Sequence, residues 1–469
     1  MKGTSSLQKQ KGIATLLVTS LLVSSALVVS MSSYKNVFYQ IKRAQNEVKS
    51  RQSHWMAEGG LECAYAQYQL NGAIPTSLTD CGSGLANSMT MTTGTEGIVV
   101  TSANEYAGLH KVIQGGGSIG NGAIQTTADL YFRGSVNFYV PDPGDFNTTE
   151  DGWECTVLKY KSRVHLNASA TNSGLKFSNY DPFEDFDSQA YGDKDCAASH
   201  KTNGGGSAEL NATLPSTVKN DFQHDPNLSL FDSFFGVSKS AHDTIRDNGK
   251  FAVLYGVDVT SSAPLALKDP DTGVVGTTTG YVTVKKVPEC GKAIAEKISK
   301  DKERFIWVEG GCEISSENYN SLVAKTQSEK DGVLIVVHDG ILSIMNEGTH
   351  NSEGQGSGNA NGSPSNAFKG VIFHFNHNYK PSFNDWMLYS GANKVINASS
   401  PVFPLEYRQN AAFYQHGSPT AEGGTFLDLP NQSALYNASL AYYYNRDIIS
   451  SLQGELTEQR WQKGSWYAN

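Results

Sequence analysis

The sequence predicts an α+β protein in which one long N-terminal helix is joined to a large β-rich, disulfide-bonded domain. Three observations favour this fold class. A charge-free apolar run extends from Ile13 to Met31. The chain has 46 glycines in 469 residues and only 18% charged residues, a composition typical of turn-rich β proteins. All six cysteines follow the apolar run.

The apolar run is long enough to cross a membrane. A helix over residues 13–31 would be about 28 Å long, close to the ~30 Å hydrocarbon core of a bilayer. Lys2, Lys9 and Lys11 precede the run without any acidic residue. Because positive charge favours the cytoplasmic side, we expect the chain to cross outward once.

The helix is expected to continue beyond the membrane. No proline occurs before Pro75, and Val37, Ile41, Ala44 and Val48 recur at helical spacing opposite a charged face. Glycines 59 and 60 are the first strong helix breaker, so the prediction is one helix over residues 13–58. A cleaved signal peptide or a plain signal anchor is the alternative interpretation.

Charge divides the chain into two parts. Residues 1–51 contain eight lysines and arginines but one acidic residue, for a net charge of +7. The whole chain carries −9, so the remaining 418 residues carry −16. An acidic body makes phosphate-driven binding unfavourable, and we expect no specific nucleic acid partner.

A short basic leader that ends in glycine, followed by an apolar and then amphipathic helix, resembles the type IV prepilins and pseudopilins. The resemblance implies that a prepilin peptidase cuts after Gly12 and that Ile13 becomes the N-methylated new N-terminus. The segment from Arg51 to Glu62, RQSHWMAEGGLE, is similar to the R-Q-x-x-x-x-A-E-A-G-L-E stretch of PilX-type minor pilins. Gly59 stands where that family has alanine.

One position departs from the major pilins. They carry glutamate at the fifth mature position, where this chain has Leu17. An unpaired carboxylate in hydrocarbon is costly, and in the family its partner is the N-terminus of a neighbouring subunit. A subunit without it suits a tip position. PilX-type pilins and the K-type pseudopilins of type II secretion share this absence.

The rest of the chain is predicted to be β-rich. Residues 158–168 alternate strictly and indicate one strand, and other strands are expected at 128–140, 281–287, 305–308, 333–337 and 371–375. Helices are expected near 229–246, 291–302 and 315–328. Glycine-punctuated stretches at 115–140 and 332–375 favour stacked short strands of the kind found in a β-solenoid, although no clean repeat emerges.

These features predict a domain organisation. We expect a prepilin leader at 1–12, the pilin helix at 13–58, a β-rich body at 59–349 and its C-terminal part at 367–469. The segment 350–366 is rich in Gly, Ser and Asn and is expected to be flexible. It either divides the body into two lobes or forms a long loop within one domain.

An even number of cysteines beyond a membrane segment indicates disulfides, and six allow fifteen pairings. Nearness in sequence favours Cys63–Cys81, Cys155–Cys196 and Cys290–Cys312. The resemblance to PilX-type large pilins adds support to the last pair, because a C-x21-C element with a helix and a strand between the cysteines is similar to theirs. No CxxC pair is present to suggest structural zinc or redox chemistry.

Several motifs suggest chemistry without the context that it needs. Residues 115–120 fit G-x-G-x-x-G and G-x-S-x-G, but no helix is predicted to follow. His374 and His377 should face opposite sides of a strand. Acidic side chains near Cys196 are weak calcium candidates. They are Asp185, Asp187, Asp193 and Asp195. The aromatic run 442–444, with Trp461, Trp466 and Tyr467, suggests either packing or a binding surface.

The sequence and the resemblance together lead us to expect a non-enzymatic PilX-like minor pilin that primes type IV pilus assembly and lies at the pilus tip. Adhesion or aggregation would fit that position. Expected partners are other minor and major pilins, prepilin peptidase, the inner-membrane assembly machinery and a surface or cell receptor. The body would be periplasmic until assembly. We expect no cofactor. The alternatives are a K-type pseudopilin and a membrane-anchored periplasmic enzyme.

Overall fold

The computed structural model describes residues 7–71, 81, 88–94, 97–114, 122–167, 169–176, 180–204, 207–327, 329–345, 367–417, 421–438, 440–456, 460–461, 465 and 467–468. The chain forms two compact units. The first comprises residues 1–94, 98–113 and 461–469, and the second, here called the body, comprises 95–97 and 114–460. A long N-terminal helix followed by a β-rich, disulfide-bonded domain is the predicted fold class.

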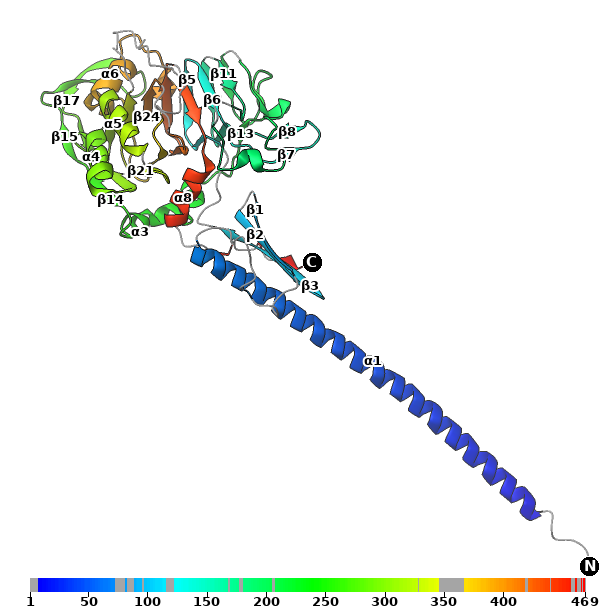
Figure 1. The fold of residues 1–469 in the computed structure, drawn as a ribbon. Helices are drawn as coiled ribbons and strands as arrows, with labels where there is room; N and C mark the ends of the chain where they lie inside the picture. Colours follow the sequence, from blue (N-terminus) through cyan, green and yellow to red (C-terminus); the bar gives the residue numbers. More distant parts are fainter. Residues whose placement is uncertain are drawn as a thin grey trace, which may run out of the picture. The chain divides into compact units, whose positions relative to one another are not determined.

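The first unit is built on α1 (Leu7–Asn71), a single helix of 65 residues (Figure 1). Every residue from 13 to 52 is exposed, whereas Ala57, Leu61 and Ala64 are fully buried. The buried side chains lie one helical turn apart and therefore on one face. Among the described residues, α1 thus packs against its own chain through its C-terminal part.

That part of α1 packs on a small sheet. The sheet has the order β1 (Ser88–Gly94), β2 (Gly97–Asn104), β3 (Ala107–Gln114) and β28 (Arg460–Trp461), and β29 (Tyr467–Ala468) also pairs with β3. Val100, Leu109 and Ile113 of the sheet form one apolar cluster with the buried side chains of α1. The first unit is therefore held by contacts between the start and the end of the chain.

The predicted end of the helix is wrong. The helix does not stop at residue 58 but passes through Gly59 and Gly60 to Asn71. Each glycine inside a helix costs about 1 kcal/mol relative to alanine. Gly60 is buried beside Leu61, so the helix–sheet packing on either side of the pair offsets this cost.

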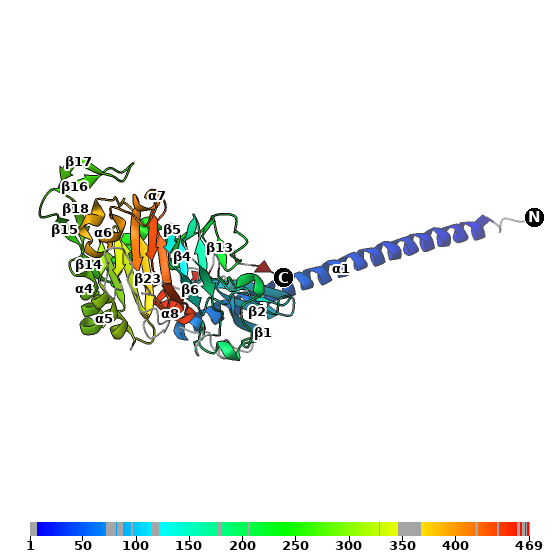
Figure 2. The ribbon, with the colours of Figure 1, turned by 90° about the horizontal axis from the view of Figure 1, so that it is seen from above.

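The body contains two large sheets whose strands run in matching order. The first has the order β13 (Phe222–His224), β9 (Leu158–Tyr160), β4 (Ile124–Thr126), β25 (Gly424–Asp428), β23 (Gly370–Phe375), β21 (Val333–His338), β19 (Phe305–Glu309) and β14 (Ala252–Tyr255). All its neighbours pair in parallel. This order can be followed in Figure 2 from β14 through β23 and β4 to β13.

The second sheet has the order β12 (Ala208–Leu210), β10 (Val164–Asn167), β5 (Asp129–Arg133), β26 (Ser433–Asn437), β24 (Ala411–His416), β22 (Leu342–Met345) and β20 (Cys312–Ile314). A third, smaller sheet has the order β11 (Ala170–Asn172), β6 (Val136–Tyr139) and β27 (Leu440–Tyr443). Consecutive strands such as β4, β5 and β6 enter the three sheets in turn and form one rung. The expected stacked short strands are present as these rungs.

The rungs are not stacked in chain order. The chain lays down β4–β6, then β9–β11, then β12 and β13, and next crosses to β14 at the far edge of the first sheet. It returns through β19, β21 and β23 until β25, β26 and β27 pair with β4, β5 and β6. We call this junction the seam.

Helices and small ribbons cover the rungs. The helices are α2 (Leu230–Phe235), α3 (His242–Arg246), α4 (Cys290–Glu296), α5 (Ser316–Thr326), α6 (Ser390–Ile396), α7 (Leu405–Arg408) and α8 (Arg446–Leu456). Short helical turns lie at Phe186–Ser188, Ala198–His200, Lys239–Ala241, Lys297–Asp301 and Asp385–Leu388. The ribbons are β15 (Val257–Thr260) with β18 (Thr283–Lys286), β16 (Leu265–Lys268) with β17 (Val275–Gly280), and β7 (Phe146–Asn147) with β8 (Gly152–Trp153).

Apolar side chains fill the space between the sheets. The strand β21 reads VLIVVH and all six of its residues are buried, as parallel strands covered on both faces require. At the corners between strands, neighbouring rungs approach closely. A Cβ on Gly340 would lie 2.2 Å from the backbone nitrogen of Gly311, so only glycine fits there.

Two expectations about the body need correction, and one open alternative is decided. The alternating segment 158–168 is not one strand, because β9 and β10 belong to different sheets. Residues 59–349 do not form one unit, because 59–94 and 98–113 belong with α1. The segment 350–366 lies outside the described residues, but it does not separate two lobes, because β21 before it pairs with β23 after it.

Candidate functional site

The N-terminal part of α1 carries the residues expected to be processed. Gly12 lies within the helix, and Ile13 and Leu17 are 68% and 59% exposed. The helix Ile13–Tyr68 is long and apolar enough to cross a membrane, and its most apolar window is not buried against the rest of the described chain. An exposed apolar surface of this length is suited to contact lipid or other helices.

Four hydroxyl side chains in the apolar stretch are satisfied within the helix. Thr19 Oγ1 donates to the carbonyl of Thr15 at 3.0 Å, and Ser20 Oγ donates to the carbonyl of Leu17 at 2.9 Å. Ser24 and Ser25 make the same kind of bond one turn further along. A hydroxyl bonded in this way adds little cost in hydrocarbon, so these groups do not argue against a membrane helix.

The disulfides join the cysteine pairs that nearness in sequence favours. Cys63–Cys81 ties the end of α1 to the chain that follows it, with the Cα atoms 5.6 Å apart. Cys155–Cys196 and Cys290–Cys312 close loops of the body with Cα separations of 5.5 and 5.3 Å. All six cysteines are used, so the chain has no free thiol.

Among the weak calcium candidates, the Asp195 carboxylate fixes a loop. Asp195 accepts from Lys201 Nζ at 2.5 Å and from the backbone nitrogens of Leu175 and Cys196 at 2.8 and 2.7 Å. Burial raises the pKa of Asp195, but Lys201 and these backbone donors outweigh it and leave the pKa lowered. Asp193 accepts from Lys176 Nζ through its backbone carbonyl oxygen and not through its carboxylate.

Asp185 precedes the short turn at Phe186–Ser188, and Asp187 lies within it. Asp185 has a left-handed backbone, and its carbonyl accepts from Ser188 Oγ at 2.7 Å. The described residues contain no group of three His, Cys, Asp or Glu side chains placed to hold a metal ion.

The two histidines do separate, but not by strand alternation, because β23 ends at Phe375 and His377 lies beyond it. His374 is fully buried, its Nε2 lies 2.9 Å from the carbonyl oxygen of Gly340, and burial lowers its pKa to about 4. His377 is exposed. The structure instead groups His377 with His242 and His338, with ring centroids 5.0 and 4.5 Å from that of His242. This trio comes from three distant segments, so sequence spacing could not reveal it.

The aromatic candidates are mostly packing residues. Tyr442, Tyr443 and Tyr444 are buried. Trp461 stacks on Tyr65 of α1 with ring centroids 4.8 Å apart, and its Nε1 donates to Glu62 at 3.2 Å. Trp466 and the glycine-rich motif at 115–120 lie outside the described residues, and only the backbone of Tyr467 is described.

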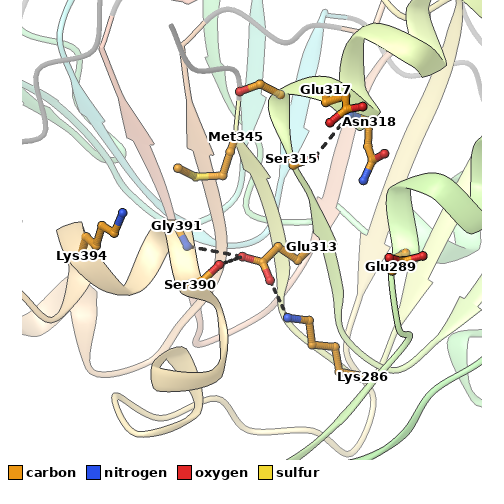
Figure 3. A pocket seen from close by; sticks show the side chains of 12 residues that line it. Lys286, Glu289, Glu313, Ser315, Glu317, Asn318, Met345, Ser390, Gly391 and Lys394 are labelled. Atoms are coloured by element: carbon orange, nitrogen blue, oxygen red, sulfur yellow. Dashed lines mark hydrogen bonds and ion pairs between the residues drawn. The ribbon is translucent and has the colours of Figure 1, made fainter. Parts of the chain in front are cut away.

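A polar pocket of about 630 Å³ lies beside the edge of the second sheet (Figure 3). Glu313 of β20 is at its centre and pairs with Lys286 of β18 at 2.5 Å. The other oxygen of Glu313 accepts from Ser390 Oγ and from the backbone nitrogen of Gly391, each at 3.4 Å. Glu313 therefore caps the start of α6.

Other groups of the pocket are also engaged in structure. Lys286 donates to the carbonyl of Leu388 at 2.9 Å and lies over the ring of Tyr389 at 4.4 Å. Ser315 Oγ caps α5 by accepting from the backbone nitrogen of Asn318. The side chains that line the pocket are mainly polar or charged, so the pocket has the chemistry to hold a polar ligand.

Comparison with known proteins gave no relative. No family model matches the chain, and neither the curated proteins nor the solved structures contain a match.

Proposed function

We propose that this protein is a minor pilin of the PilX type, which primes type IV pilus assembly and occupies the pilus tip. The observation that carries the proposal is α1, which is exposed from residue 13 to residue 52 while its C-terminal part packs on its own small sheet. Such a helix can lie in a membrane and later pack beside other pilin helices without rearranging the first unit.

The rest of the chain is consistent with a terminal position. Leu17 offers no carboxylate to a neighbouring N-terminus, so contacts are needed on one side only. The body extends from 114 to 460 and is far larger than the helix that would carry it. A body of this size would be crowded if it were repeated along a slim fibre, but a single copy at the tip would not be.

Mass spectrometry of the mature N-terminus tests the proposal. We expect the chain to begin at an N-methylated Ile13. A Gly12→Val variant should remain uncut, whereas the control variant Gly3→Val should be processed like the native protein. A mature start near Ser33, or an intact Met1 in the native protein, would contradict the pilin assignment.

A deletion strain tests the place of the protein in the pilus. We expect fewer pili, restored by the native gene and not by the Gly12→Val variant, together with normal protein secretion. Normal pili with lost secretion would contradict the minor-pilin proposal and favour a pseudopilin.

A further inference from the structure

Two buried cations lie where the ribbon of β16 and β17 meets α6 and α7. Lys268 is the last residue of β16 and Arg408 is the last residue of α7, and they are 8% and 5% exposed. Figure 2 shows these elements on the same side of the body. Lysine and arginine are almost never buried to this extent unless their charge is paired. A counter-charge is therefore expected beside them.

Both cations bind the C-terminal end of α6. Lys268 Nζ donates to the carbonyl of Asn397 at 3.1 Å, and Arg408 Nη1 donates to the carbonyl of Ile396 at 3.1 Å. These carbonyl groups belong to consecutive residues, so the two charged groups lie close together. A helix end attracts cations, but with a partial negative charge only. The end of α6 therefore offsets part of the positive charge and not the whole of it.

The carboxylates that lie nearest in sequence are bound elsewhere. Asp269, the next residue after β16, accepts from two backbone nitrogens of its own turn at 2.9 and 2.8 Å. Asp385 accepts from the Tyr379 hydroxyl at 2.7 Å, and Glu406 Oε1 lies 3.8 Å from Arg163 Nη1. Among the described residues, neither buried cation forms an ion pair with an acidic side chain.

The pKa values of the two cations reflect this lack of a counter-charge. Burial lowers the pKa of Lys268, and the nearby Arg408 lowers it further. Burial also lowers the pKa of Arg408. No acidic group in the described part of the chain opposes either shift. The surroundings therefore disfavour the charged forms, as expected for like charges that are buried together without an anion.

Both cations also have hydrogen-bond donors that α6 does not use. Arg408 Nε is buried and has no acceptor among the described residues. The guanidinium carbon of Arg408 lies 5.3 Å from the ring centroid of Phe383, so one face of the group is covered and its edge is left for hydrogen bonds. The ammonium group of Lys268 likewise carries more N–H groups than the one that binds Asn397. Buried donors without acceptors are costly, so an acceptor with several oxygens suits this position.

We propose that Lys268 and Arg408 together hold a small oxyanion of the phosphate or sulfate class. Such an anion can balance both charges, and its oxygens can accept from both side chains at once. The planar donors of arginine match the geometry of these anions. The anion must be small because both side chains are buried, and the exposed turn 269–272 directly after Lys268 offers it a short path from solvent. The site belongs to the body, so it does not rest on the pilin proposal.

Equilibrium dialysis with radioactive phosphate tests the site directly. The full chain is kept in a detergent that contains no phosphate, and we expect it to bind one phosphate per chain that sulfate displaces. Lys268→Met and Arg408→Gln should each weaken binding by at least about tenfold, because each removes a charged hydrogen-bond donor. Lys380→Met is the matched control, since Lys380 is exposed, and it should bind phosphate as the native chain does.

Thermal unfolding separates a specific site from a general effect of salt. Sulfate stabilises folded proteins in general, whereas a bound ligand adds stability only where its site is intact. At equal ionic strength, replacing chloride by sulfate should raise the Tm of the native chain and of Lys380→Met more than that of Lys268→Met. Cooperative unfolding of Lys268→Met in chloride shows that this variant folds.

The proposal would be overturned by a native chain that binds no phosphate, or by binding that Lys268→Met and Arg408→Gln leave unchanged. An equal rise in Tm with sulfate in all the proteins would likewise count against it, because the salt would then act generally. Displacement of phosphate by chloride as readily as by sulfate would show that the site does not select an oxyanion.

Discussion

Glu422 is a carboxyl group whose surroundings oppose its ionisation. It lies just before β25, where its backbone nitrogen donates to the carbonyl of Phe368 at 2.9 Å. Burial raises its pKa to about 7, and the nearby Lys369 only partly offsets this. A carboxyl with a raised pKa in the folded state binds its proton more tightly than in the unfolded chain. It therefore favours folding when protonated.

Stability should fall as Glu422 ionises. Its contribution to the free energy of unfolding is fully present below pH 4.5 and is lost as pH rises through about 7, a change of at most about 3 kcal/mol. Glu422→Gln should match the native protein at pH 5 and exceed its stability at pH 8. Urea unfolding at pH 5 and at pH 8 measures the free energy of unfolding of both proteins.

The exposed Glu406 provides the matched control. Glu406→Gln should show the same difference in the free energy of unfolding between pH 5 and pH 8 as the native protein. An equal pH response in the native protein and in Glu422→Gln would contradict the assignment of the titration to Glu422.

At the scale of elements, the C-terminal part of α1 owes its helical state to the sheet that it covers. Glycines 59 and 60 made a helix end the reasonable prediction from local propensity. The prediction failed because this part of the helix is stabilised by Leu61 packing on Val100 and Leu109. These partners are distant in sequence, so no local pattern reveals them. Removing part of that cluster should therefore affect helix and sheet together.

Leu61→Ala should lower the stability of the first unit by about 2–4 kcal/mol, because Leu61 is fully buried. Hydrogen exchange at the amides of β3 should accelerate accordingly, while exchange in β21 of the body stays unchanged. Trp55→Ala is the control, since Trp55 on the same helix is 70% exposed. Equal acceleration of β3 by both variants would argue against this packing.

Other elements show what sequence can and cannot predict. The strands near 305–308, 333–337 and 371–375 were recognisable because their buried apolar runs are local signals. The corner between β9 and β10 was missed because the alternation of side chains continues through it. The pocket around Glu313 draws on residues from 286 to 394, and no spacing rule brings Lys286, Glu313 and Ser390 together. The disulfide pairs could be predicted because the partner cysteines are near each other in sequence.

At the scale of the whole molecule, the seam joins the beginning and the end of the body. β4, β5 and β6 pair with β25, β26 and β27, and the rings of Phe132 and Tyr436 stack across the seam with centroids 4.7 Å apart. Rungs on both sides depend on this junction for a complete set of strand hydrogen bonds. The body should therefore unfold as one cooperative unit.

Tyr436→Ala should destabilise the whole body by about 3–5 kcal/mol, because the side chain is fully buried. Hydrogen exchange should show equal loss of protection in β10 on one side of the seam and in β21 on the other. Loss of protection confined to one side would show that the two halves fold independently. Ser216→Ala, a change at an exposed position of the body, is the control and should leave protection in both strands unchanged.

The seam also has a consequence for the time course of synthesis. Thr425 of β25 follows its neighbour Ile124 of β4 by about 300 residues. At ~5–20 residues per second, the ribosome adds them in roughly 15–60 s. Throughout that interval the earliest rung presents an unpaired strand edge to its surroundings. A chain that ends prematurely never covers this edge. Incomplete molecules therefore differ from complete ones by an exposed strand edge, before any partner binds.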